Sequence, residues 1–338
     1  MSPRTPSPRS RTVPFALLAV LLVVAQPTFV GAAAADTGTV VEQEGDVATF
    51  TVALDGSNEA TVQVGTEAVN YEVNVTVRGS GDEVTLRMNT YEAGGWRGAT
   101  PEEVFSAEDG RVVSATRSTP TLDAPIDTGS YRIYTRIDGQ LTDLGVLTLE
   151  ERATGNLTVF TVPAGASMDS VENVTGSATA TTKVARGDYL VARIDASGLS
   201  GYVRNVDDVQ GGTAGVHVDV YAERPNARGD PVDLQSGSFF RDGDRIYLAF
   251  DTDDLDAEPG DGYRLEFRID GDENPYVKPG RTERLAGEIT IRPRRVVFAE
   301  EPVVVDAAAN QRIDLRTSVA PGTRLTLELL SASLDAPF

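Results

Sequence analysis

The chain has 338 residues, with 51 acidic against 30 basic side chains, a formal net charge of −21 and no cysteine. This composition excludes disulfides and thiolate metal sites, and it argues against a nucleic-acid partner, because phosphate binding requires clustered Lys and Arg. Only Lys183 and Lys278 are lysines. An acidic surface with so little lysine is typical of proteins from very salty surroundings, where a Debye length of about 3 Å at molar salt screens carboxylate repulsion. A specific cationic partner is the alternative explanation of the acidity.

The N-terminus has the three-part layout of an export signal. Three arginines precede an apolar run from Val13 to Val24, and small residues from Ala32 to Ala35 offer cleavage positions. The run is short for a membrane span of about 20 residues, so cleavage is favoured over anchoring. The sequence therefore predicts a secretory signal peptide over residues 1–35 and a mature chain outside the cell without a membrane span.

Beyond Asp36 the pattern is one of strands and turns. Apolar and polar residues alternate with period two, which indicates strands with one buried face, and pairs such as Asp55-Gly56 interrupt the runs. The clearest strands are predicted at Val47–Leu54, Tyr71–Arg78, Ile246–Phe250 and Leu325–Leu329. A single helical turn is expected at Glu102–Phe105, after Pro101. Short strands at this spacing predict an all-β sandwich or barrel.

One stretch of sequence occurs twice. DTGSYRIYTRIDG ends at Gly139, and GDGYRLEFRIDG ends at Gly271. The first copy contains Asp127-Thr128-Gly129-Ser130-Tyr131, the usual context of a tyrosine corner in immunoglobulin-like sandwiches, where the tyrosine near the start of the sixth strand bonds upstream backbone. Tyr263 occupies the matching position in the second copy.

The flanking residues extend the repeat. Antibody domains carry a cysteine two residues after this tyrosine, and here Ile133 and Leu265 stand at those positions, so packing must replace the disulfide. A further strand follows each copy, at Leu144–Leu149 and Ala286–Ile291. The pairs Gly45-Asp46 and Gly187-Asp188 each precede an early strand and are also equivalent in the repeat. The last residues contain three further strand-like runs, VVFAEEPVVV, RIDLRTSV and TRLTLELL.

The predicted fold is therefore all-β, with tandem immunoglobulin-like β-sandwich modules. Module 1 covers residues 36–152 and module 2 covers residues 153–293. Residues 294–338 form either a partial third module or strands added to module 2.

Three Asn-x-Ser/Thr sequences are candidate N-glycosylation sites, at Asn74, Asn156 and Asn173. Asn74 alternates out of phase with the apolar residues of its strand and should face solvent. Asn156 follows a predicted module boundary and Asn173 precedes a Gly-Ser-Ala-Thr stretch, so both are expected to be exposed. The alternative is that each is an ordinary polar residue.

Other candidate chemistry is weak. The acidic run containing Asp251, Asp253, Asp254 and Asp256 could bind Ca²⁺, but it lacks the glycine and terminal acid of an EF-hand loop. His217, the only histidine, lies in an alternating strand and is better explained as a solvated residue than as a catalyst, and no Gly-x-Ser-x-Gly elbow occurs. Trp96 could stack on a sugar, although an anchoring role in a core or loop is favoured.

The stretch from Gly45-Asp46 to Gly95 resembles the repeated surface domain of haloarchaeal surface-layer glycoproteins and their relatives, the BGTF-type surface domain proteins. The resemblance rests on Gly45-Asp46, Glu59-Ala60-Thr61-Val62, Gly65, Asn70-Tyr71 and Asn89-Thr90-Tyr91, and on the later phrases RGDYLVARIDASGL and VAPGTRLTLELLS. It implies immunoglobulin-like modules in the cell envelope, N-glycosylation and a largely architectural role.

These observations predict an exported, halophilic cell-surface structural protein without enzymatic activity, either a component of the surface layer (S-layer) or a glycoprotein associated with it. Its expected partners are copies of itself in a lattice or other envelope proteins, together with surface cations such as Ca²⁺. The alternative is a secreted binding module that recognises a sugar or a protein through the loop around Trp96. A glycoside hydrolase, which needs two carboxylates about 5–9 Å apart across a cleft, is a third possibility.

Overall fold

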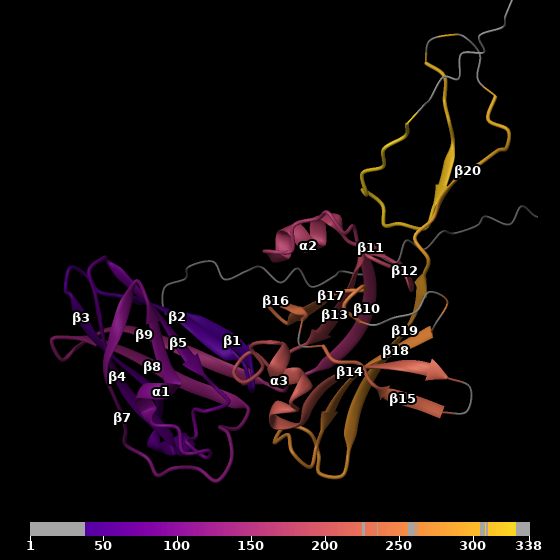
Figure 1. The fold of residues 1–338 in the computed structure, drawn as a ribbon. Coiled ribbons are helices and arrows are strands. Elements are labelled where there is room, and N and C mark those ends of the chain that lie inside the picture. The colour runs from indigo at the N-terminus through magenta and orange to yellow at the C-terminus, as the bar shows by residue number, and fades with distance from the viewer. Residues whose placement is uncertain are drawn as a thin grey trace, which may run out of the picture. The chain divides into compact units, whose positions relative to one another are not determined.

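The computed structural model describes residues 38–224, 227–234, 236–255, 260, 262–304, 308 and 310–328. The predicted signal peptide, residues 1–35, lies outside this part of the chain. All the described residues belong to one unit of the chain. Within it, the described strands up to β19 build two β-sandwiches, and a separate two-stranded sheet follows (Figure 1).

The first sandwich packs a six-stranded sheet, in the order β1-β9-β8-β3-β4-β7, against a three-stranded sheet, β2-β5-β6. Its strands are β1 Thr39–Gln43, β2 Val47–Ala53, β3 Glu59–Thr66, β4 Tyr71–Gly79, β5 Glu83–Asn89, β6 Phe105–Glu108, β7 Gly110–Arg117, β8 Gly129–Ile137 and β9 Gln140–Glu150. A 3₁₀ turn η1, Glu67–Val69, and a helical turn α1, Pro101–Val104, complete it.

Alternation of apolar and polar residues explains this first sandwich. On β4 the side chains of Tyr71, Val73, Val75 and Val77 are all 1 % exposed or less, and they lie in one apolar core with the inward residues of the facing sheet. The predicted helical turn is confirmed as α1, where the Thr100 side chain and the N3 glutamate form a capping box.

The second sandwich consists of two five-stranded sheets, β11-β10-β13-β17-β16 and β12-β19-β18-β14-β15. Its strands are β10 Thr154–Val162, β11 Thr179–Ala180, β12 Lys183–Ala185, β13 Tyr189–Ala196, β14 Val216–Arg224, β15 Ala227–Pro231, β16 Ser238–Asp242, β17 Arg245–Asp251, β18 Gly262–Asp270 and β19 Thr282–Arg292. Its short helices are α2 Val171–Ser177, α3 Val206–Gln210 and the 3₁₀ turn η2 Thr213–Gly215. None of these three was predicted from the sequence.

Strand order makes both sandwiches immunoglobulin-like. In each, the tyrosine-bearing strand (β8 or β18) lies between the last strand of the sandwich (β9 or β19) and an earlier strand (β3 or β14). In each, a short early strand (β1 or β12) pairs in parallel with that last strand. The repeated segment is therefore the same strand in two sandwiches, as its sequence predicts. In the first sandwich β2 begins directly after Gly45-Asp46, and in the second β13 begins directly after Gly187-Asp188.

The residues after 293 differ in part from the prediction. β20 Val296–Phe298 and β21 Leu315–Thr317 pair with each other in an antiparallel two-stranded sheet and with no strand of the second sandwich's sheets. The expected strand at Leu325–Leu329 is wrong for its described part, because residues 325–328 form no strand. In the described residues, β20 and β21 pair only with each other, so residues 325–328 have no neighbouring strand to bond with.

Candidate functional site

The most elaborate polar arrangement that we find in the described residues lies at the junction between the two sandwiches, and it begins at Gly45-Asp46. Gly45 has a φ of +91°, a conformation that favours glycine, and its N–H donates to the Thr90 hydroxyl at 2.9 Å. The Thr90 hydroxyl and backbone N–H both donate to the Asp46 carbonyl, at 2.7 and 3.0 Å. These bonds fix the backbone of Asp46 within the first sandwich and leave its side chain free to point elsewhere.

The Asp46 carboxylate binds the second sandwich. It accepts backbone N–H groups from Gly198 at 2.5 Å, Leu199 at 2.9 Å and Ser200 at 2.8 Å, in the loop between β13 and α3. Asp46 is only 4 % exposed, so these bonds form away from solvent. Consecutive backbone N–H groups that converge on one anion form a nest, and charge-assisted bonds of this kind are stronger than neutral ones.

Glycines allow the two backbones to approach closely at this contact. Gly198 has a φ of +73°, and a Cβ there would lie 2.5 Å from the Glu44 carbonyl oxygen. The Gly201 N–H donates to the Gly45 carbonyl at 3.0 Å, and the Asn89 side-chain amide donates to the Gly201 carbonyl at 2.9 Å. A side chain at either Gly45 or Gly198 would therefore separate the sandwiches.

An aromatic cluster of Tyr91, Trp96 and Tyr202 packs at the contact between the two sandwiches. Tyr91, which follows β5 of the first sandwich, belongs to the apolar core of the second sandwich and is 2 % exposed. Its ring stacks on Tyr202 with centroids 4.2 Å apart, and Trp96 packs edge-on against it at 5.3 Å. The Trp96 indole N–H donates to the Tyr91 carbonyl at 2.7 Å. Trp96 is thus a partly buried anchor of the junction, the reading that the sequence favoured over a sugar platform.

Arg152 fixes the short connection between β9 and β10. Its side chain is 2 % exposed and forms an ion pair with Glu283 at 2.8 Å, and its other nitrogens donate to the Ser197 carbonyl and the Thr154 hydroxyl. Burial raises the pKa of Glu283, but hydrogen bonds from Arg152 and Thr154 outweigh burial and hold that pKa below its ordinary value. The ion pair and hydrogen bonds of Arg152 therefore fix the connection between the two sandwiches.

The junction also contains acids with raised pKa values. Burial, and next the charge of Asp46, raise the pKa of Glu42 to about 7. Burial and Asp46 likewise raise the pKa of Asp244. The charges of Arg241 and Arg245 oppose this rise in the pKa of Asp244, and the Arg241 guanidinium donates to the Val203 carbonyl at 2.9 Å. Near neutral pH, the protonated and the ionised forms of Glu42 are therefore both populated.

The three candidate glycosylation sites lie on three different elements. Asn74 is half-buried on β4, Asn156 is exposed on β10, and Asn173 is exposed on α2, where its side chain donates to Asp169 at 2.5 Å.

The tyrosine-corner residues lie within each sandwich. The Tyr131 hydroxyl donates to the Asp127 carbonyl at 2.6 Å, and Gly129 begins β8 with a φ of +150°. Tyr263 is 6 % exposed at the matching position of β18. Ile133 and Leu265 are fully buried, one in each core. Each sandwich thus has apolar packing where an antibody domain has a disulfide.

The remaining candidates have ordinary surroundings. Asp251 ends β17, and Asp253 and Asp254 follow in a turn where the Asp253 N–H donates to the Asp251 carboxylate. Asp256 lies outside the described residues. In the part of the chain that the structure describes, no three His, Cys, Asp or Glu side chains are placed to hold a metal ion. His217 is partly exposed on β14, where burial and the charge of Arg268 lower its pKa.

Sequence reasoning missed the role of Asp46 and Thr90. The sequence marked Gly45-Asp46 as a repeated pair that precedes a strand and as part of a resemblance, and it marked Asn89-Thr90-Tyr91 only as part of that resemblance. The backbone N–H groups that bind the Asp46 carboxylate lie 152–154 residues further along the chain and belong to residues with no distinctive side chain. Thr90 bonds Gly45 and Asp46 within the first sandwich.

Comparison with known proteins gives this arrangement a context. A family model described as a domain of unknown function (DUF7827) matches residues 27–138. The chain is 28 % identical over 320 residues to a cell surface glycoprotein of Haloferax gibbonsii, an alignment that covers 86 % of this chain and 36 % of the relative. It is 26 % identical over 369 residues to cell surface glycoprotein 1 of Haloarcula hispanica, covering 91 % of this chain and 40 % of the relative.

The chain is a distant homologue of haloarchaeal cell surface glycoproteins. It spans about two fifths of the length of the curated relatives it matches. These relatives are named as surface glycoproteins and not as enzymes. None of the helices in the described residues has the length and apolar content of a membrane span.

Solved structures with partial similarity include the Ig1-Ig2 region of Dpr2 in complex with DIP-Theta. Its TM-score is 0.23 at 10 % identity, covering 76 % of this chain and 62 % of that one. The titin domains z1z2 in complex with telethonin match with a TM-score of 0.18 at 13 % identity, covering 77 % of this chain and 96 % of that one.

Proposed function

We propose that the chain is an exported structural protein of a haloarchaeal cell surface, either a component of the S-layer or a glycoprotein associated with it. The observation that carries this proposal is the homology to haloarchaeal cell surface glycoproteins over 86–91 % of the chain. The mechanism is mechanical: β-sandwiches resist deformation, and the junction transmits force from one sandwich to the next.

The junction supports this role. A flexible linker would let adjacent sandwiches move independently, whereas Asp46, Tyr91 and Arg152 each hold the second sandwich through buried contacts. Burial matters in brine, because salt screens exposed ion pairs far more than buried ones. Copies of the chain in a lattice, or other envelope proteins, are the partners that such a protein would have, and its acidic faces would hold hydrated cations, Ca²⁺ among them.

Export and glycosylation belong to the same proposal. Residues 1–35 would act as a cleaved secretory signal peptide. Asn74, Asn156 and Asn173 would receive N-linked glycans, and the exposure of Asn156 and Asn173 supports access by a glycosylating enzyme. The alternative binding module receives less support, because Trp96 packs into the junction.

Cell fractionation combined with intact-mass measurement tests this function. We expect the chain in the envelope fraction, with a mass that shows loss of residues 1–35 and addition of glycan. Single Asn→Gln substitutions at the three sites should each remove one glycan from the mass where that site is occupied. Recovery of the uncleaved, unmodified chain in the cytosol would refute the proposal.

A further inference from the structure

The two-stranded hairpin after residue 293 opens with the same strand pairing and the same hydrogen bonds as the second sandwich. β20 pairs with β21 in the antiparallel manner in which β10 pairs with β13. The Arg295 N–H donates to the Ser318 hydroxyl at 2.9 Å, and the Ser318 N–H donates to the Arg295 carbonyl at 3.1 Å. In the second sandwich Ala153 and Ser197 make the same two bonds, at 2.9 and 3.0 Å. Ser318 therefore occupies the position of Ser197.

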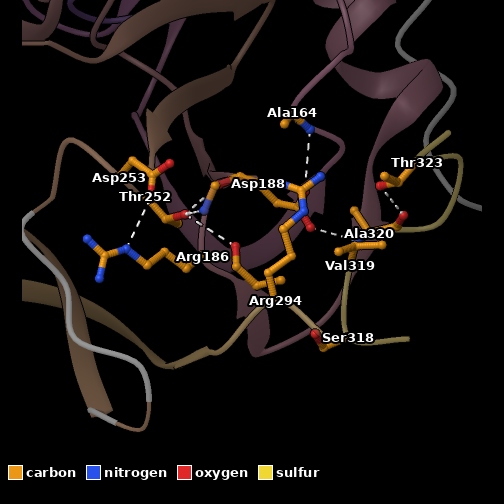
Figure 2. Close-up of polar contacts among 12 residues, drawn as sticks. Ala164, Arg186, Asp188, Thr252, Asp253, Arg294, Ser318, Val319, Ala320 and Thr323 are labelled. Carbon is orange, nitrogen blue, oxygen red and sulfur yellow. Dashed lines mark hydrogen bonds and ion pairs between the residues drawn. The ribbon is translucent and has the colours of Figure 1, made fainter. Parts of the chain in front are cut away.

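The second sandwich also presents the group that the first one presents. Gly187 has a φ of +81°, and its N–H donates to the Thr252 hydroxyl at 2.8 Å, as Gly45 donates to Thr90. The Thr252 hydroxyl in turn donates to the Asp188 carbonyl at 2.8 Å. Asp188 is fully buried, and Figure 2 shows its side chain between the Ala164, Arg294 and Ala320 segments.

Both aspartates bind the N–H group at the same position, counted from the serine of the loop that they contact. The Asp188 carboxylate accepts the Ala320 N–H at 2.7 Å, two residues after Ser318. At the first junction Asp46 accepts the Leu199 N–H, two residues after Ser197. A strand-opening aspartate thus binds the loop that follows the second strand of the next hairpin, and it does so at both junctions.

We propose that Asp188 is a docking site for a third β-sandwich, of which β20, β21 and the loop at residues 318–323 form the opening part. The partner that this site fits is a loop directly after a β-strand that offers a backbone N–H to a buried carboxylate, whose own backbone is held by Gly187 and Thr252. One contact, repeated along the chain, then sets the geometry between every pair of neighbouring modules. The docking site rests on the hydrogen bonds above and is independent of the cell-surface role.

The second junction differs from the first in strength. Pro321 stands where the first junction has Ser200 and has no N–H to donate, and the Val319 N–H donates to the Thr317 hydroxyl at 3.2 Å. The close backbone donor from the hairpin is therefore Ala320, with the Arg294 guanidinium 4.0 Å from the carboxylate. We expect the hairpin to separate from the second sandwich more readily than the two sandwiches separate from each other.

Hydrogen exchange on the full chain, with Asp188→Asn and Asp46→Asn compared side by side at molar KCl, tests the docking site. Asp188→Asn should lower protection of the Ala320 amide and of the β20–β21 amides by about tenfold or more, with the Leu199 amide unchanged. Asp46→Asn should do the reverse. The exposed Asp242→Asn is the matched control and should change neither.

The β13 amides report whether the second sandwich itself remains folded. If Asp188→Asn leaves Ala320 protection unchanged, or lowers β13 protection equally, Asp188 does not dock the hairpin and the proposal fails. Ala320→Pro removes the donor while every group of the second sandwich stays intact. It should expose the β20–β21 amides to the same extent, and unchanged protection there would also overturn the docking site.

Discussion

Replacing Asp46 by Asn is the sharpest test of the first junction, because the substitution keeps the size and shape of the side chain and removes its charge. Asp46 Oδ2 accepts the Gly198 N–H, and Oδ1 accepts the N–H groups of Leu199 and Ser200. An asparagine retains one carbonyl oxygen, which can continue to accept two of these groups. Its NH₂ then faces the third N–H, so two donors confront each other in a buried site.

The expected cost follows from these three bonds. A buried donor without a partner costs about 1–3 kcal/mol, and two bonds that become neutral each lose about 1 kcal/mol. We therefore expect Asp46→Asn to lower the free energy of unfolding by about 3–5 kcal/mol. The Asp46 backbone contacts with Thr90 do not involve the carboxylate, so the first sandwich itself should stay folded.

Chemical denaturation at molar KCl, followed by tryptophan fluorescence and circular dichroism, measures this effect. Trp96 lies in the junction, so its fluorescence should change at lower denaturant concentration in the variant than the circular dichroism of the sheets does. Asp55→Asn, the same substitution at an exposed turn residue with a φ of +47°, is the matched control and should be neutral. A loss below about 1 kcal/mol for Asp46→Asn would show that the nest does not hold the sandwiches together.

Three further changes probe the junction and the fold. Gly198→Ala should destabilise by at least about 2 kcal/mol more than Gly139→Ala in thermal unfolding, because both have positive φ but only the first Cβ meets backbone, 2.5 Å from Glu44 O; equal losses would contradict the close approach. Glu42 holds a proton in the folded state up to a pKa of about 7 against an ordinary value of 4.5, so its contribution to stability is present below pH 4.5 and is lost as the pH rises to about 7. Glu42→Gln should therefore remove up to about 3 kcal/mol of this fall in a denaturation series from pH 4.5 to 8, and an unchanged pH profile would count against the raised pKa. Tyr131→Phe should cost about 1 kcal/mol in the same assay by losing its bond to upstream backbone, and a neutral effect would argue against the tyrosine corner.

Local pattern was sufficient to predict much of the fold. Period-two alternation located β2, β4 and β17, and Pro101 marked the helical turn α1. The repeated tyrosine segment located β8 and β18, which hold equivalent places in their two sheets. Strand patterns depend on nearest neighbours in the chain, which is why they can be recognised without coordinates.

The junction could not be predicted in the same way. Asp46 is recognised by backbone N–H groups, and any non-proline residue supplies such a group, so the loop from Gly198 to Ser200 carries little side-chain signal. Tyr91 looks like a core residue of the first module and packs into the core of the second. The parallel pairing of β1 with β9 was also not predicted, because it joins segments about 100 residues apart. Both modules do carry a common pattern, in which Gly-Asp precedes one strand and Asn-Thr or Asp-Thr ends another. The sequence alone does not show that the threonine bonds the Gly-Asp pair.

A contact between a carboxylate and backbone amides explains how such modules can diverge and still dock in one geometry. The binding side needs one aspartate with its supporting Gly and Thr, and the bound side needs only a loop of defined shape. The same contact suits molar salt, since an exposed pair such as Arg78–Glu59 contributes little and is screened. The carboxylates of Asp46 and Asp188 are buried, so salt screens their bonds much less than it screens such surface pairs.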